Sequence, residues 1–416
     1  MRQNHNNKRY FRNLRLSTPF LFLLSWLLFM PFQAFSALQT PETPIFPSEL
    51  TTPQIEEGWI SLFDQKSLFG WKPTSDAPWK AENGEIRIHS GQQGLLRTTS
   101  QFDDFELTVE FKAEKGTNSG IFFRTSPKPN NVARDCYELN IASPENPFPT
   151  GSLVGRKKCE PTVTPNQWHR FHVTANGANI KIKLDDEQVL NYTDPNPIGR
   201  GYIGLQLNQG AIAFRNIALK PLNTRSLLDG PALAQWDTSQ KLKSTFELTQ
   251  QNELRILNGK GQIESRGLFG DFIFSMQCKT NAVGLNSGVF FRCIPGEVMN
   301  GYESQIQNLF KNNDPSQPVD CGTGGIFRRS DARRVNAVDQ AWFTKTIIAT
   351  GPHVSVWVNG YQVTDWSDTR KPDRNPRRGL RLEKGTIIFQ GHDPTTDILL
   401  KNIRAKEIAP RRPARK

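Results

Sequence analysis

The sequence predicts an all-β protein with two tandem sandwich or jelly-roll domains. The heptapeptide at residues 118–124 returns at residues 286–292 with one isoleucine exchanged for valine, so a whole structural unit is repeated. Apolar and polar residues alternate with the period of a half-buried antiparallel strand in several stretches. Beyond the amino-terminal segment there is no helical periodicity of useful length, and Gly, Pro and Asn turns separate the short strands. A chain of 416 residues agrees with two domains of about 170 residues each.

The amino-terminal segment has the three parts of a secretory signal peptide. A positively charged region precedes an apolar run from Pro19 to Phe32, and Ala34-Phe35-Ser36 follows with small residues at the usual cleavage spacing. We therefore expect residues 1–37 to be removed during export to the periplasm or the extracellular space, which would leave no stable membrane span. The alternative is an uncleaved anchor, although the apolar run is short for a span of about 20 residues.

Residues 38–55 are rich in Pro and Thr and are expected to form a flexible leader, and residues 409–416 form a basic tail. The net charge is +12, and part of it lies in the two ends of the chain. A basic protein can bind nucleic acid through its charge alone. No helix-turn-helix, zinc-finger or RNA-recognition pattern accompanies the charge, so we expect no nucleic-acid partner.

Five cysteines follow the signal peptide. In an exported protein Cys136 could pair with Cys159, or Cys293 with Cys321, and each pair would close a loop inside one domain. Their spacing does not match a zinc site.

The first domain is expected at residues 56–221. It opens with Gly-Trp-Ile-Ser-Leu-Phe-Asp at residues 58–64, and a Gly-Trp pair follows at residues 70–71. Residues 105–112 alternate between apolar and polar side chains, as do residues 180–184, so both segments should be strands. Arg-Asn-Ile at residues 215–217 closes the domain.

The second domain is expected at residues 225–408. Leu-Leu-Asp-Gly at residues 227–230 is a weaker copy of the opening motif, and Phe-Gly-Asp-Phe at residues 269–272 answers Phe-Asp-Asp-Phe at residues 102–105. An alternating stretch at residues 354–358 runs into Asn359-Gly360, a strong signal for a tight hairpin. Lys-Asn-Ile at residues 401–403 closes this copy as Arg-Asn-Ile closed the first.

Strand alternation places the polar ends of each heptapeptide on one face. In the second copy Asn286 and Arg292 share that face with Phe290, and Asn118 and Arg124 are the first-copy equivalents. An amide and a guanidinium beside an aromatic ring can hold a polar ligand. A solvated face with a structural arginine would show the same pattern, so both roles remain open.

Further polar residues follow each heptapeptide on candidate strands and turns. A carboxylate and an amide lie two residues apart, basic residues follow a Thr-Gly motif, and a second polar pair comes near the end of each copy. These residues are Glu138, Asn140, Arg156, Gln206 and Asn208 in the first copy and Glu303, Gln305, Arg328, Gln390 and His392 in the second.

Glu303 and His392 could transfer protons as a pair, because imidazole titrates near neutrality and a carboxylate can orient it or act as a base itself. Arginine and amide donors could stabilise an oxyanion or an enolate. The same residues could instead bind a sugar through its hydroxyls without reacting, or His392 could be structural. Two ligands are weak evidence for a divalent metal, which therefore stays a possible cofactor.

The order and duplication of these motifs resemble the 3-keto-disaccharide hydrolase domain family. The resemblance covers residues 58–220 and 227–407, and rests on Leu-Phe-Asp, Phe-x-Asp-Phe, Asn-Ser-Gly-Ile/Val-Phe-Phe-Arg, Tyr-Glu and Thr-Gly-x-Leu/Ile. It implies two tandem concanavalin A-like jelly-roll sandwiches in an exported bacterial protein. It also implies cleavage of glycosides whose sugar carries a ketone at carbon 3, whereas the fold alone would equally suit a non-catalytic, lectin-like binding or adhesion module.

The implied reaction needs a base at carbon 2, a group that stabilises the enolate and an acid for the leaving group. By motif, the resemblance assigns Glu303 and His392 as acid and base, with Arg292 and Gln305 binding the oxyanion or the substrate. In the first copy the matching residues are Asn118, Arg124, Glu138 and Gln206. The first copy has Asn208 in place of the histidine, so the more complete site is expected in the second domain.

Overall fold

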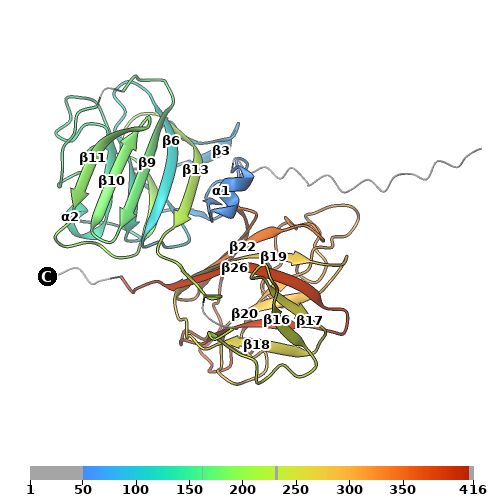
Figure 1. Cartoon of the computed structure of the whole chain (residues 1–416). Helices are drawn as coiled ribbons and strands as arrows, with labels where there is room; N and C mark the ends of the chain where they lie inside the picture. The colour runs from blue at the N-terminus through green and yellow to red at the C-terminus, as the bar shows by residue number, and fades with distance from the viewer. Residues whose placement is uncertain (1–49, 162, 230–232, 412–416) are drawn as a thin grey trace, which may run out of the picture. The chain divides into compact units, whose positions relative to one another are not determined.

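The computed structural model describes residues 50–161, 163–229 and 233–411. The predicted signal peptide, most of the leader and most of the basic tail therefore lie outside the described residues. Within the described ranges, no helix is long and apolar enough to cross a membrane. Helices are limited there to the short α1 (Thr52–Glu56) and α2 (Val132–Asp135), and the predicted all-β fold of two tandem concanavalin A-like jelly-roll sandwiches is confirmed (Figure 1).

The first sandwich packs an eight-stranded sheet against a five-stranded sheet. The larger sheet consists of β11 (Glu187–Thr193), β10 (Asn179–Leu184), β9 (His169–Asn176), β6 (Phe105–Ala113), β13 (Ile212–Pro221), β4 (Glu85–Ile88) and β3 (Lys80–Glu82), with β1 (Ile60–Ser61) paired to β13. The smaller sheet consists of β2 (Trp71–Pro73), β5 (Gly94–Thr98), β12 (Tyr202–Leu207), β7 (Ser119–Thr125) and β8 (Tyr137–Ile141). All strand pairs in both sheets are antiparallel.

The second sandwich repeats this topology strand for strand. Its larger sheet consists of β16 (Thr245–Leu248), β17 (Leu254–Leu257), β26 (Asp397–Glu407), β19 (Phe272–Thr280), β22 (Phe343–Thr350), β23 (His353–Val358) and β24 (Tyr361–Ser367), with β14 (Arg225–Ser226) paired to β26. Its smaller sheet consists of β15 (Trp236–Asp237), β18 (Gly261–Ser265), β25 (Thr386–Gly391), β20 (Ser287–Cys293) and β21 (Tyr302–Ile306). The two heptapeptides therefore occupy equivalent strands, β7 and β20, one strand from the edge of the smaller sheet.

Each core lies between the two sheets of its sandwich. In β6 the apolar residues alternate as the sequence predicts: Phe105, Leu107, Val109 and Phe111 are buried, and the residues between them are partly exposed.

The opening motifs of the two copies form the same hydrogen bond. The indole of Trp71 donates a hydrogen bond to the Leu62 carbonyl, as the indole of Trp236 does to that of Leu227.

The five cysteines, all of them within the described residues, are free thiols. The predicted pairing of Cys136 with Cys159, or of Cys293 with Cys321, is therefore not formed. Cys136 and Cys293 are instead buried in small apolar clusters, beside Phe122 in the first copy and beside Phe290 in the second.

The described residues belong to one compact unit, and several hydrogen bonds join the two sandwiches within it. The Trp357 indole donates to the Ser61 carbonyl at 2.9 Å, and Ser100 donates to the Ser355 hydroxyl at 2.9 Å. The guanidinium of Arg333 reaches Asp64 at 2.6 Å. Residues of the first opening motif thus also contact the second copy.

Candidate active site

The outward face of each five-stranded sheet carries the predicted polar residues at the same register. Glu138 of β8 lies opposite Phe122 of β7, and Glu303 of β21 lies opposite Phe290 of β20. Two residues further along, Asn140 and Gln305 lie opposite the glycines of the two heptapeptides. The predicted side-by-side arrangement of carboxylate and amide is therefore present in both copies.

The heptapeptide glycines give each carboxyl group its space. A Cβ atom at Gly120 would lie 3.3 Å from Cγ of Glu138 and 3.5 Å from Oε1 of Gln206. At Gly288 the added atom would lie only 2.7 Å from Oε1 of Glu303, a distance that real Cβ contacts do not reach. These glycines serve close approach rather than a turn, because neither has a positive φ.

Both glutamates titrate near neutrality. Burial raises the pKa of Glu138 to about 7, and a hydrogen bond from the Gln206 amide offsets part of this effect. Burial likewise raises the pKa of Glu303 to about 7, against the lowering influence of the Arg377 charge. A carboxyl group with a pKa close to the working pH can accept and release protons, as general acid–base chemistry requires.

Unpartnered amide oxygens lie around both glutamates. Within the described chain, Oδ1 of Asn140 and Oε1 of Gln206 are buried without a hydrogen-bond partner, and so are Oε1 of Gln305 and Oε1 of Gln390. Buried polar atoms are nearly always hydrogen-bonded. Unpartnered amide oxygens at equivalent positions in both copies suit a ligand that donates hydrogen bonds, such as a sugar hydroxyl.

Asn286 orients one of these amides. Its Oδ1 accepts a hydrogen bond from Nε2 of Gln305 at 3.3 Å, and both side chains donate to Oδ2 of Asp320, at 2.8 and 2.7 Å. Asn118, its equivalent, exchanges two backbone hydrogen bonds with Gln209 at the end of the sheet. Both asparagines thus lie beside the polar face, next to the residues that project from it.

The predicted placement of Arg124 and Arg292 on the open polar face is wrong. Only 2% of Arg124 and 1% of Arg292 is exposed, and both have positive φ angles at a bulge that interrupts strand alternation. The Arg292 guanidinium donates to three backbone carbonyls and to Asp271. Arg124 does the same with three other carbonyls and Asp104. Their donors bind distant loops of the protein itself and leave little for a ligand.

The other two predicted arginines differ from each other. Arg156 is directed inward: it donates to the carbonyls of Val132 and Ala133, and its guanidinium lies 4.4 Å from the ring centre of Tyr137. Arg328 is exposed, and its charge is among the influences that lower the pKa of Glu303. Of the predicted arginines, therefore, only Arg328 remains available at the polar face.

The structure does not form the predicted pair of Glu303 and His392. Glu303 and Ile388 lie opposite the same residue, Phe290, in neighbouring strands. His392 is four residues beyond Ile388, so it lies about 13 Å further along the sheet and about 10 Å across two strand spacings. Its Nδ1 is paired instead with Oδ2 of Asp393 at 2.8 Å. His392 is thus too far away to orient Glu303.

No group of three or more His, Cys, Asp or Glu side chains that could hold a metal ion occurs within the described residues. A divalent metal at Glu303 and His392 would need both side chains on one ion, and their positions in the sheet separate them. The described residues therefore offer no ready set of ligands for the divalent metal that the sequence left possible.

Sequence reasoning missed Lys345, which supports the strand that carries Glu303. Lys345 is fully buried, and its Nζ donates to the carbonyls of Ser304 and Gln305, each at 2.8 Å. Burial lowers the pKa of this amine to about 7. Phe171 holds the equivalent register position in the first copy. The sequence signal that could have identified Lys345 is a lysine at an inward-facing position of a predicted strand.

Sequence reasoning also missed the segment that covers part of the second polar face. Met299 packs against Phe290 and Ile388, and its backbone N–H donates to Oε1 of Gln262 at 2.6 Å. Nε2 of Gln390 is directed at the Met299 sulfur at 3.3 Å. A thioether is a weak hydrogen-bond acceptor, so the Gln390 amide can donate to a stronger acceptor instead.

Both halves of the sequence match one known domain family. The sequence matches the 3-keto-alpha-glucoside-1,2-lyase-like domain twice, at residues 58–220 and 223–406. A 3-keto-disaccharide hydrolase from Bacteroides thetaiotaomicron is 35% identical over 42% of this chain and 82% of that protein.

Two solved structures are more distant. A protein from Parabacteroides distasonis, described as a candidate glycosyl hydrolase, has 19% identity and a TM-score of 0.38, over 42% of this chain and 98% of its own. The carbohydrate binding module CBM66 from Bacillus subtilis has 18% identity and a TM-score of 0.31, over 36% and 95%. The match to each of these two structures covers less than half of this chain.

Proposed function

The chain belongs to the 3-keto-alpha-glucoside-1,2-lyase-like domain family, and from this premise we propose that it cleaves glycosides whose sugar is oxidised to a ketone at carbon 3. The family is a glycosyl hydrolase-like, carbohydrate-active one. The observation that supports the proposal best is a buried carboxyl group with a pKa of about 7 beside unpartnered amide oxygens, present at the same place in both sandwiches. We also propose that the protein acts after export, because residues 1–37 have the pattern of a signal peptide.

The proposed reaction begins at carbon 2. The neighbouring ketone acidifies the hydrogen there, and the carboxylate of Glu303 or Glu138 removes it, which leaves an enolate with its charge on the ketone oxygen. The enolate then expels the substituent at carbon 1, whose oxygen takes up a proton, and water adds to the resulting unsaturated ketone. Gln390 or Gln206 can donate a hydrogen bond to the enolate oxygen, and amide oxygens can accept from the sugar hydroxyls.

Chromogenic substrates test this function directly. The protein is incubated with p-nitrophenyl 3-keto-glucosides of both anomers and with the unoxidised glucosides, and release of p-nitrophenol is followed. We expect p-nitrophenol to be released from a 3-keto-glucoside and not from the unoxidised glucosides. No release by the folded protein, or equal release from the unoxidised sugar, would contradict the proposal, and saturable binding without release would identify a lectin-like module. Loss of release with a chelator, restored by a divalent ion, would add a metal.

His392→Ala is expected to reduce kcat/KM for the 3-keto-glucoside by less than about tenfold, because the imidazole lies too far from Glu303 to share a proton with it. The matched control is Asn208→Ala, at the equivalent position of the first copy. A loss of a hundredfold or more in the histidine variant alone would restore His392 to a catalytic role.

Gly288→Ala should displace the carboxyl group of Glu303, because the added methyl group would lie 2.7 Å from its Oε1. We expect kcat/KM of the second site to fall by about a hundredfold, since an error of about 1 Å in a reacting group has effects of this size. Gly267→Ala is the control, as the added atom there meets its nearest neighbours at an ordinary 3.4 Å. The test is made in an E138Q background so that only the second site is measured. Unchanged activity would show that Glu303 is not the base.

A further inference from the structure

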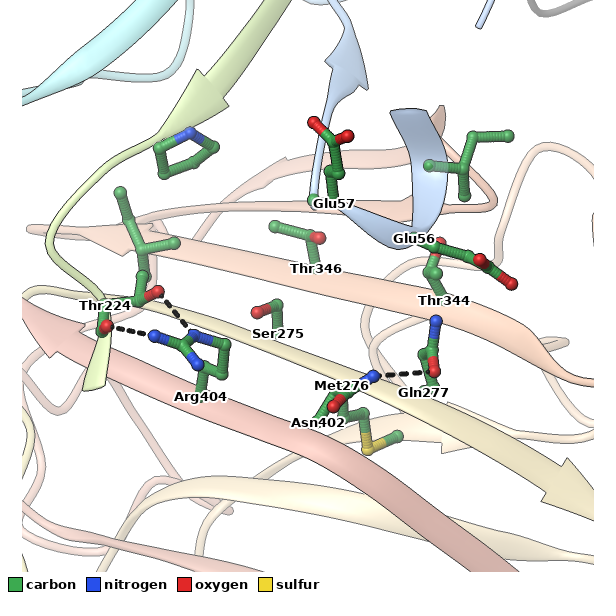
Figure 2. A pocket seen from close by; sticks show the side chains of 14 residues that line it. Glu56, Glu57, Thr224, Ser275, Met276, Gln277, Thr344, Thr346, Asn402 and Arg404 are labelled. Atoms are coloured by element: carbon green, nitrogen blue, oxygen red, sulfur yellow. Dashed lines mark hydrogen bonds between the residues drawn. The ribbon is translucent and has the colours of Figure 1, made fainter. Parts of the chain in front are cut away.

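A polar pocket lies on the opposite side of the second sandwich from Glu303. Figure 2 shows it on the outward face of β19, β22 and β26 of the eight-stranded sheet, closed by the end of α1 and by the chain after β13. Glu303 projects from the outward face of the five-stranded sheet, so the whole core separates the two places. The pocket is lined by Ile55, Glu56, Glu57, Gly58, Pro221, Thr224, Ile273, Ser275, Met276, Gln277, Thr344, Thr346, Asn402 and Arg404.

The floor of this pocket is made of neutral hydrogen-bonding groups that the protein leaves unused. Ser275 pairs in register with Thr346, and Gln277 with Thr344. Within the described residues, the hydroxyls of Ser275, Thr344 and Thr346 have no hydrogen-bond partner, although Thr346 is only 5% exposed. Oε1 of Gln277 accepts a hydrogen bond from Nδ2 of Asn402 at 2.9 Å, and within the described residues the Gln277 amino group and the Asn402 oxygen have no partner of their own.

The equivalent face of the first sandwich has a different chemistry. Thr108 pairs there with His172, and Glu110 with Arg170, at the same register in β6 and β9. Its charged groups have partners within the protein: Glu110 accepts from Arg215 at 2.7 Å, for example. The second copy thus carries uncharged hydroxyl and amide groups where the first carries charges that are satisfied locally.

The charges around the pocket do not favour an anion. Arg404 donates to the hydroxyl and the carbonyl of Thr224, at 3.0 and 2.7 Å, and the exposed carboxylates of Glu56 and Glu57 lie at the rim. The unpartnered groups can both donate and accept hydrogen bonds. Such a set suits a neutral ligand with many hydroxyl groups.

We propose that this pocket binds a neutral saccharide through the hydroxyls of Ser275, Thr344 and Thr346 and the amides of Gln277 and Asn402. The site would hold a single sugar unit of a saccharide without reacting with it, so it does not depend on the 3-keto reaction. A sugar needs no ketone to bind here, and the carboxyl groups of Glu138 and Glu303 take no part.

The test uses the full chain and three unoxidised probes, maltose, cellobiose and trehalose, with binding measured by saturation-transfer NMR and calorimetry. We expect at least one probe to bind, and the double variant S275A/T346V to weaken it by about tenfold or more, which corresponds to the loss of one or two hydrogen bonds. Thr344→Val is an independent second variant. Thr108→Val, at the first-copy counterpart of Ser275, is the matched control and should leave binding unchanged.

Three results would overturn the proposal. They are the absence of binding by every probe, unchanged binding by the folded S275A/T346V and T344V variants, and loss of binding in the E138Q/E303Q variant. The last result would place the sugar on the outward faces of the five-stranded sheets, which carry Glu138 and Glu303. Release from a 3-keto-glucoside is measured separately on S275A/T346V, so failure of this pocket and failure of the proposed reaction can be told apart.

Discussion

Replacing Glu303 and Glu138 together with glutamine is expected to reduce release from a 3-keto-glucoside by about 10²–10⁴-fold, the range that a positioned general base contributes. The amide keeps the shape of the carboxyl group but cannot accept the proton from carbon 2. The single variants E138Q and E303Q then divide the activity between the sandwiches. Glu110→Gln, on the outward face of the larger sheet, is the control and should have no such effect.

The pH dependence of kcat/KM provides a second readout of the same residues. The pKa of each glutamate is raised to about 7, so the carboxyl groups are largely protonated below that pH and cannot act as bases. Activity should therefore rise with pH through about 7 and then level off. The residual activity of E138Q/E303Q should lack this rise. A rate that falls as the pH increases through 7 would show that the protonated carboxyl group is the form required.

Arg292→Leu is expected to destabilise the protein by about 3–5 kcal/mol, because three backbone carbonyls lose their buried donor and Asp271 loses one of its two arginine partners, the other being Arg200. Arg124→Leu should have a similar effect through Asp104. The free energy of unfolding is measured with denaturant, at constant m-value. The exposed Arg328 is the matched control, and Arg328→Leu should change stability by no more than about 0.5 kcal/mol. Normal stability of Arg292→Leu with lost activity would instead support the ligand-binding role first expected for this residue.

Much of the fold could be predicted from the sequence. The alternation at residues 105–112 and the repeated heptapeptide depend on one local property, because successive side chains of a strand point to opposite faces. That same property placed Glu138 and Asn140, and Glu303 and Gln305, together on one outward face, as the structure has them. These features need only neighbours in the chain, so the sequence by itself determines them.

The remaining features depend on contacts between distant segments. A bulge carries Arg292 inward to loops about 20 to 90 residues away in the chain, where its charge is satisfied. The register of β21, β20 and β25 separates Glu303 from His392, although both were read as members of one polar surface. The buried amine of Lys345 and the pocket over Thr346 likewise come from several strands. Only the tertiary structure decides these points, because alternation gives the face of a side chain but not which strands lie beside it, nor how far apart two residues on one face are.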